Sequence, residues 1–203
     1  MIDGLALFFL VLELWVPVYW LLVHPFAPFW RRQPRKWLRL LAAAVWLGGA
    51  LALLWPYEWW LAERFLTAGW RIPVGLALAG GDIWLTTKVE REMGWRVMIG
   101  LPEVARRTPE AAETPPLPAV EGLYRWVRHP RYLGTVLAWL AAVALSGATR
   151  LAVLVGVFFG LMFLMIEWEE RELVARFGAG YREYQRRTPR LLPLGGWRRR
   201  ADS

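Results

Sequence analysis

The chain has 203 residues, of which 57% are hydrophobic, and its formal net charge is +8 at neutral pH. It contains no cysteine, which excludes disulfide bonds, thiolate catalysis and cysteine-ligated zinc. Its two histidines are too few for a histidine-based metal site. A carboxylate magnesium site stays open, but we expect no metal. The apolar residues come in long uncharged runs, which favour a membrane protein. The arginines lie beside these runs, so a membrane surface explains the basic charge and we expect no nucleic-acid partner.

The apolar runs predict an all-α, polytopic integral membrane protein with about five transmembrane helices. In chain order, the expected spans are residues 4–23, 40–55, 65–87, 132–148 and 151–166. The third is the weakest, because Arg71, Pro73 and Asp82 interrupt it. We treat the chain as a single membrane domain, 1–203. It divides into three N-terminal spans (1–90), a cytoplasmic loop (91–131), a helical hairpin (132–166) and a cytoplasmic tail (167–203).

The loops between the expected spans differ in their content of arginine and lysine. The first loop, the third loop and the tail are rich in arginine, whereas the second and fourth loops contain only Arg64 and Arg150. The positive-inside rule then places the N-terminus outside and the C-terminus in the cytoplasm. The third loop includes a proline-rich stretch, residues 101–120, that disfavours long helix. The sequence leaves open whether this stretch is a flexible loop or a lid.

Two charged segments flank the predicted hairpin. The segment RHPRYLG, which begins at Arg128, precedes it, and the segment EWEERE, which contains Glu169, follows it. Each lies about 20 residues from the turn at 146–150, so at 1.5 Å per residue both arms return to the same membrane face. We therefore expect the basic and the acidic segment to lie together at the cytoplasmic interface.

The basic segment suits an anion. Pro130 is expected to be the first residue of the fourth span, where its missing N–H costs nothing. The amides that follow, such as those of Tyr132 and Leu133, and the guanidinium of Arg128 favour a carboxylate or phosphate. The acidic segment on the other arm suits a cation. Together they fit a zwitterion such as an amino-acid head group.

Each segment alone has a simpler explanation. Arginines at the end of a span commonly set topology, and adjacent glutamates at a helix end are commonly solvated. The coincidence of both segments at one place is what favours a binding site.

The run GLYRWVRHPRYLG, followed one span later by EEREL and RFGAGYREYQRRTPRLLP, resembles a known signature. It is similar to that of the isoprenylcysteine carboxyl methyltransferase and phospholipid methyltransferase superfamily. The shared elements are RHPxYxG, a glutamate pair, Phe-Gly, two spaced tyrosines and a proline. In this chain they are Arg128, His129, Pro130, Tyr132, Gly134, Glu169, Glu170, Phe177, Gly178, Tyr181, Tyr184, and Pro189 or Pro193. The resemblance covers the C-terminal part of the chain, from residue 122 on.

The resemblance implies an integral membrane methyltransferase that uses S-adenosylmethionine. Its cofactor site is then cytoplasmic and is formed by the helical hairpin, the loop and the tail. The implied catalytic residues are Arg128, Glu170 and Arg171. The implied cofactor-binding residues are Val120, Gly122, Tyr124, Arg128, His129, Pro130, Tyr132, Leu133, Gly134, Glu169 and Glu170.

The acceptor that the resemblance implies is lipophilic and enters from the lipid bilayer. Methylation of an isoprenylcysteine-type carboxylate is the expected reaction, while a lipid amine or a small lipophilic metabolite stays open. Glu13, Arg71 and Asp82 are interior ionisable groups and so are candidates to meet the acceptor. The sequence does not indicate the oligomeric state.

Two alternatives belong to other functional classes. One is an NADPH-dependent membrane reductase of the sterol type, because such proteins carry a related RHPxYxG segment and a similar tyrosine-rich tail. The other is a non-catalytic membrane scaffold of the same fold, although the intact signature argues against it.

Overall fold

The structure is a computed structural model of the 203-residue chain. It describes residues 2–8, 10, 13, 26, 29, 40–41, 44–45, 47–49, 51–52, 55–94 and 122–192. The named elements are α4 (Tyr57–Leu61), α5 (Arg71–Met93), the 3₁₀ helix η2 (Gly122–Arg125), α8 (Pro130–Ser146), α9 (Thr149–Phe177) and α10 (Ala179–Arg187). Within these ranges the sole β contact is an isolated bridge between Arg64 and Ala148. The all-α prediction is therefore confirmed for the part of the chain that the structure describes.

The three long helices correspond to the last three predicted spans. α9 is long and apolar enough to cross a membrane, and it is the one helix among the described residues that meets both criteria. α8 is apolar but shorter. The expected spans 4–23 and 40–55 are described only in part. The number of spans and their orientation thus stay predictions.

α5 differs in its limits from the predicted span 65–87. It begins at Arg71 and continues to Met93. Arg71 and Pro73 therefore lie in the first helical turn, where a proline is tolerated because no intrahelical N–H is required. The guanidinium of Arg71 donates to the backbone oxygen of Leu145 at the end of α8. Residues that interrupt the apolar run in the sequence thus form the start of the helix.

A tight turn joins α8 to α9, as the sequence predicts. Only Gly147 and Ala148 separate the two helices. Gly147 has φ 67°, and its N–H donates to Val143 O at 2.7 Å. Its carbonyl accepts the amide of Phe65 at 3.0 Å. A Cβ at Gly147 would overlap the carbonyl of Leu66, so the backbone conformation and the close approach both require glycine.

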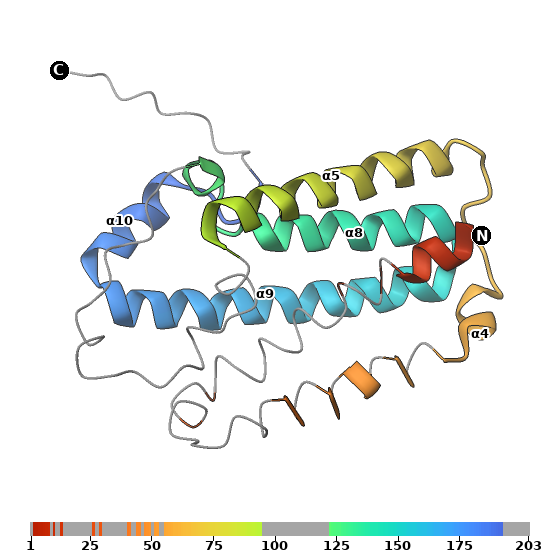
Figure 1. Cartoon of the computed structure of the whole chain (residues 1–203), viewed down its shortest axis with the longest axis horizontal. Coiled ribbons are helices and arrows are strands. Elements are labelled where there is room, and N and C mark those ends of the chain that lie inside the picture. Colours follow the sequence, from red (N-terminus) through yellow and green to blue (C-terminus); the bar gives the residue numbers. More distant parts are fainter. Residues whose placement is uncertain are drawn as a thin grey trace.

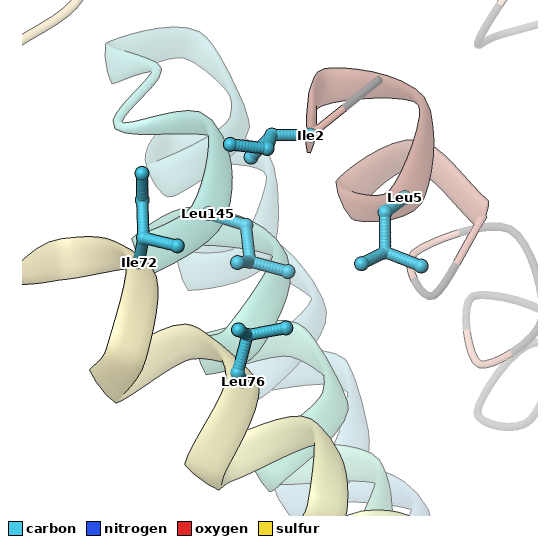
Figure 2. A pocket seen from close by; sticks show the side chains of 5 residues that line it. All are labelled: Ile2, Leu5, Ile72, Leu76 and Leu145. Atoms are coloured by element: carbon cyan, nitrogen blue, oxygen red, sulfur yellow. The ribbon is translucent and has the colours of Figure 1, made fainter.

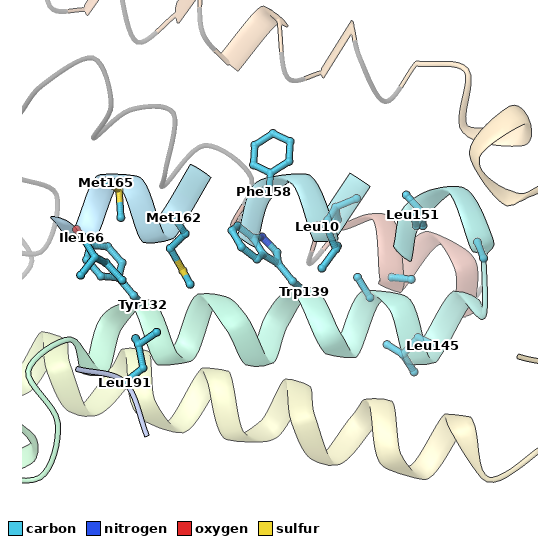
Figure 3. Close-up of a cluster of buried hydrophobic side chains, with 14 residues drawn as sticks. Leu10, Tyr132, Trp139, Leu145, Leu151, Phe158, Met162, Met165, Ile166 and Leu191 are labelled. Carbon is cyan, nitrogen blue, oxygen red and sulfur yellow. The ribbon is translucent and has the colours of Figure 1, made fainter. Parts of the chain in front are cut away.

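α8 is the central helix and packs against α5 on one side and α9 on the other (Figure 1). Small residues line the contact with α5, among them Ala79, Ala138 and Ala141. Large side chains fill the contact with α9 (Figure 3). There Trp139 presents its ring edge-on to Phe158, with the ring centroids 6.0 Å apart. This packing fixes where α8 begins, and the charged segments meet at that end.

Replacement of Gly147 by alanine tests the turn. We expect the left-handed backbone to cost about 1–2 kcal/mol, and the overlap with Leu66 adds to this. Thermal unfolding in detergent measures the loss. Gly156→Ala is the matched control, because a Cβ there meets nothing within 4 Å. The turn would not have the described geometry if the two variants unfolded at the same temperature.

Candidate functional site

The basic and acidic segments meet in the structure. Arg128 lies just before α8 and Glu170 lies on α9, and Arg128 Nε donates to Glu170 Oε1 at 2.7 Å. The two side chains are only 8% and 3% exposed. The prediction that the two arms of the hairpin return to one place is thus confirmed. The two charges pair directly with each other.

Glu170 has further partners on both of its carboxylate oxygens. His129 Nε2 lies 3.1 Å from Oε1. Gln185 Nε2 and Arg190 Nε donate to Oε2 at 3.2 Å and 3.0 Å. These partners come from the start of α8, from α10 and from the segment after α10. Glu170 is therefore a buried junction between three segments.

Arg128 also holds the end of α10. Its Nη1 donates to Gln185 O at 2.9 Å and to Thr188 O. Its backbone amide donates to Pro189 O at 2.8 Å. A cation at a helix C-terminus satisfies carbonyls that have no intrahelical partner. The guanidinium that the sequence suggests for a ligand carboxylate is thus directed at backbone oxygens and at Glu170.

Glu170 lies beyond the apolar run 151–166. The pKa of its carboxyl group is set by burial and by its hydrogen-bond partners. Burial acts to raise the pKa of its carboxyl group, but hydrogen bonds from His129 and Arg128 outweigh burial. The net effect lowers the pKa from 4.5 to about 2. The group is therefore ionised at neutral pH.

The neighbouring Glu169 is more open, with a side chain that is 22% exposed. Tyr132 donates its hydroxyl to Glu169 Oε2 at 2.8 Å. His129 Nδ1 lies 3.8 Å from the same oxygen, and its ring stacks on that of Tyr132 with centroids 5.4 Å apart. A partly open carboxylate beside two stacked rings suits an organic cation.

The helix η2 brings Tyr124 close to Glu169. It begins at Gly122, where φ is 56° and a Cβ would overlap the carboxylate of Glu92 at the end of α5. Tyr184 of α10 donates its hydroxyl to the carbonyl of Tyr124 at 2.6 Å. Burial and the nearby charge of Glu169 raise the pKa of Tyr124, so its hydroxyl stays protonated.

The first turn of α8 agrees with the sequence at Pro130 and differs at Leu133. Pro130 is the first helical residue, as predicted. The amide of Leu133 donates to His129 O at 3.1 Å, so the prediction that it is free for an anion is wrong. Only the amides of the first helical turn lack an intrahelical acceptor, and Leu133 is already the fourth residue. Gly134 follows and lies against Asp82 of α5.

Of the predicted residues, one lies outside the described part of the chain and another is placed away from this cluster. Val120, together with the proline-rich stretch 101–120, lies outside the described residues. Arg171 is on α9, but its side chain is 71% exposed and pairs with Glu167 at 3.3 Å. Its predicted catalytic role therefore has no contact with Glu170 or Arg128 to support it.

Sequence reasoning missed Arg190. Its Nη2 lies 2.7 Å from Glu167 Oε2 and 2.9 Å from Glu170 Oε2. With a side chain that is 40% exposed, it is the more accessible of the two arginines that contact Glu170. Its only signal in the sequence is its place in QRRTPRLLP, the run that follows the second tyrosine.

An apolar cavity of about 570 Å³ lies elsewhere, between residues 2–8, α5 and α8 (Figure 2). It is lined by Ile2, Leu5, Ile72, Leu76 and Leu145. Leu145 is near the end of α8, and the helix rise places it roughly 22 Å from Pro130. The cavity is therefore separate from the charged cluster. Arg71 also lies at that far end, so it is removed from the candidates that could meet an acceptor at the cluster.

Replacement of Arg128 by methionine tests the junction. It leaves Glu170 buried without its closest charged partner, which typically costs about 3–5 kcal/mol of the free energy of unfolding. Arg171→Met is the control, because it breaks an exposed pair on the same helix as Glu170 and should change stability by less than about 1 kcal/mol. Denaturant unfolding in detergent measures both. Equal stabilities of the two variants would contradict the buried pairing of Arg128 with Glu170.

The lowered pKa of Glu170 predicts a stability change with pH. Its contribution is complete above the unfolded-state value of 4.5 and is lost as the pH falls through the folded-state value of about 2. We expect the wild type to lose a few kcal/mol over this interval. Glu170→Gln should lack this part of the pH dependence. Parallel unfolding curves of the two proteins from pH 5 to pH 2 would refute the assignment.

The comparisons with known proteins find matches to the segment that contains this site. Residues 106–188 match the family described as a protein of unknown function, DUF1295. Methanethiol S-methyltransferase 2 of Bradyrhizobium diazoefficiens is 44% identical over 80 residues, which are 39% of this chain and 30% of that protein. Methanethiol S-methyltransferase 1 of the same organism is 37% identical over 103 residues, covering 50% and 34%. The methanethiol S-methyltransferase of Mycobacterium tuberculosis is 42% identical over 71 residues, covering 35% and 28%.

The matched segment spans about a third of the length of these curated relatives. No solved structure matches the chain. The match and the signature both fall on the segment that builds the Glu170 junction. The part of the chain that builds this site is therefore similar to the DUF1295 family and to the methanethiol S-methyltransferases named above.

Proposed function

We propose that this protein transfers a methyl group from S-adenosylmethionine to a lipophilic acceptor at the cytoplasmic end of a membrane-embedded helix bundle. The observation that carries the proposal is the open carboxylate of Glu169 beside the rings of Tyr132 and His129. The names of the relatives, which are methyltransferases, support the same activity. In this proposal the N-terminus lies outside, and the tail and the site lie in the cytoplasm.

The residues present fit the charges of S-adenosylmethionine. Its sulfonium and ammonium groups are cations, which suit Glu169 and the neighbouring aromatic rings. Its carboxylate requires donors, and Arg190 is a partly exposed guanidinium at the same cluster. The free amides in the first turn of α8 add an electropositive end. Glu170 then supports the site by holding Arg128 and His129 in place.

The cofactor supplies an electrophilic methyl group when bound. The contribution of the chain is to hold donor and acceptor in line, and such alignment can supply roughly 7–11 kcal/mol. The junction serves this purpose because it fixes the start of α8 relative to α9 and the tail.

A thiol is the acceptor that we favour. The relatives named above are methanethiol S-methyltransferases, and a small thiol partitions into a bilayer. The isoprenylcysteine-type carboxylate expected from the sequence is the alternative. The two differ in one chemical requirement, since a carboxylate is already deprotonated whereas a thiol must lose its proton to become the nucleophile.

The reductase alternative is not favoured, because the relatives named above are all methyltransferases. A direct ligand-binding experiment separates it from the proposal. S-adenosylhomocysteine and NADPH are each added to the purified protein and the thermal unfolding temperature is measured. A ligand at 100 times its Kd stabilises the folded state by about 2.7 kcal/mol. We expect a shift with the nucleoside and none with NADPH, and the reverse result would sink the proposal.

Glu169→Gln should abolish the shift with S-adenosylhomocysteine while leaving the unfolding temperature of the free protein near that of the wild type. Glu58→Gln is the matched control, because Glu58 is an exposed residue of α4. If Glu169→Gln kept the full shift, Glu169 would not be part of the cofactor site.

A further inference from the structure

α10 has two faces that meet different surroundings. Figure 1 shows the helix turning away from the axis of α9 at the end of the bundle. Its inner face is tied to the charged cluster, because Gln185 donates to Glu170 Oε2 at 3.2 Å. Tyr184, on the same face, donates its hydroxyl to the carbonyl of Tyr124. The other face, the basic face of α10, consists of Arg182, Glu183, Arg186 and Arg187.

The basic face carries more positive than negative charge. Its three arginines are all exposed, and the side chains of Arg186 and Arg187 are 72% and 60% exposed. Both of these arginines pair with the carboxylate of Glu183. Exposed pairs along a helix are weak, and one carboxylate cannot neutralise two guanidinium groups. The face therefore presents an excess of cationic charge to its surroundings.

Contacts with α9 fix the depth of the basic face relative to the expected bilayer. α9 is long and apolar enough to cross a membrane, and its apolar run ends four residues before Glu170. Glu170 thus lies roughly 6 Å beyond that end. Gln185 and Arg190 both contact Glu170, and Arg186 and Arg187 lie between them in the chain. The polar head groups occupy about 5–8 Å on each side of the hydrocarbon core, so these arginines are held near head-group depth.

We propose that the basic face of α10 binds the phosphate groups of anionic phospholipids in the leaflet around this end of the bundle. Guanidinium groups suit phosphate because they present several N–H donors in a fixed planar geometry. A zwitterionic lipid also carries an ammonium group, which offsets the attraction, so the partner is a lipid of net negative charge. The surface lies outside the proposed cofactor site, and the inference does not depend on methyl transfer.

Lipid binding on this face would hold α10 against the bundle. The inner face contacts Glu170 and Tyr124, so the helix lies between the head groups and the charged cluster. A basic residue near an anionic membrane surface typically contributes about fivefold in affinity. Three arginines are therefore enough to make the docked position of α10 depend on the lipid around it.

The test is a titration of the chain, purified in an uncharged detergent, with dioleoyl phosphatidylglycerol or dioleoyl phosphatidylcholine. The thermal unfolding temperature is followed in both series. We expect the anionic lipid to raise it and the zwitterionic lipid to leave it unchanged. The triple variant Arg182→Gln, Arg186→Gln and Arg187→Gln should need at least about tenfold more anionic lipid for half of the shift.

Two matched variants separate charge from structure. Replacement of the same three arginines by lysine keeps the charge and should retain the wild-type response. Glu183→Gln removes the carboxylate of the basic face and should lower the concentration of anionic lipid that is required. If the triple glutamine variant fails to fold, the wild type still provides a test. Sodium chloride at about 1 M shortens the screening length to about 3 Å and should weaken its response to the anionic lipid.

The remaining outcomes overturn the inference. An equal response of the wild type to both lipids, or one that salt does not weaken, would exclude an electrostatic lipid site. A triple glutamine variant with the wild-type response would place the site elsewhere, and a lysine variant that behaves like it would mean that the arginines serve the fold. An equal shift with sodium phosphate alone would indicate a site for a free anion. Binding of S-adenosylhomocysteine is measured separately, so failure of the proposed function leaves this result unchanged.

Discussion

The buried carboxylate of Glu170 joins the start of α8, 42 positions earlier in the chain, to α10 and the segment that follows it. Its two oxygens contact the start of α8, α10 and the segment after α10. A buried ion pair of this kind contributes little net stability by itself, but loss of one partner leaves an uncompensated charge. Its main consequence is positional, because it fixes the end of the α8–α9 hairpin relative to the tail. The proposed site is built around that fixed point.

Glu169 and Glu170 are neighbours on α9, but their surroundings differ. Glu169 and Glu170 are separated by about 100° around the axis of α9, so one faces the junction and the other the opening beside Tyr132. The buried residue is nearly inaccessible, and the open one retains capacity for a ligand cation. The two acidic groups thus divide the roles of support and cofactor binding in the proposed reaction.

The sequence predicts the hairpin, the helix start at Pro130 and the meeting of the charged segments, because helix rise and span length determine them. It does not predict that Arg128 is directed at the end of α10, since that requires the tail to fold back onto α8. The pairing of Arg131 with Glu13 joins residues 118 positions apart, and no local pattern encodes it. The predicted start of the third span, residue 65, lies several residues before the start of α5 at Arg71. The reason is that a charged residue and a proline in a first helical turn look, in the sequence, like an interruption of the helix. The loop 101–120 and parts of the first two spans lie outside the described residues, so those predictions stand as they were.

The central claim is that Arg128 and Glu170 act as one unit. A double-mutant cycle with Arg128→Met, Glu170→Gln and the combined variant measures the coupling between them in the free energy of unfolding. Contacting residues in one network typically show coupling of about 0.5–3 kcal/mol, and the structure predicts a value of at least about 1 kcal/mol in that range. Strict additivity of the two single changes would contradict the account.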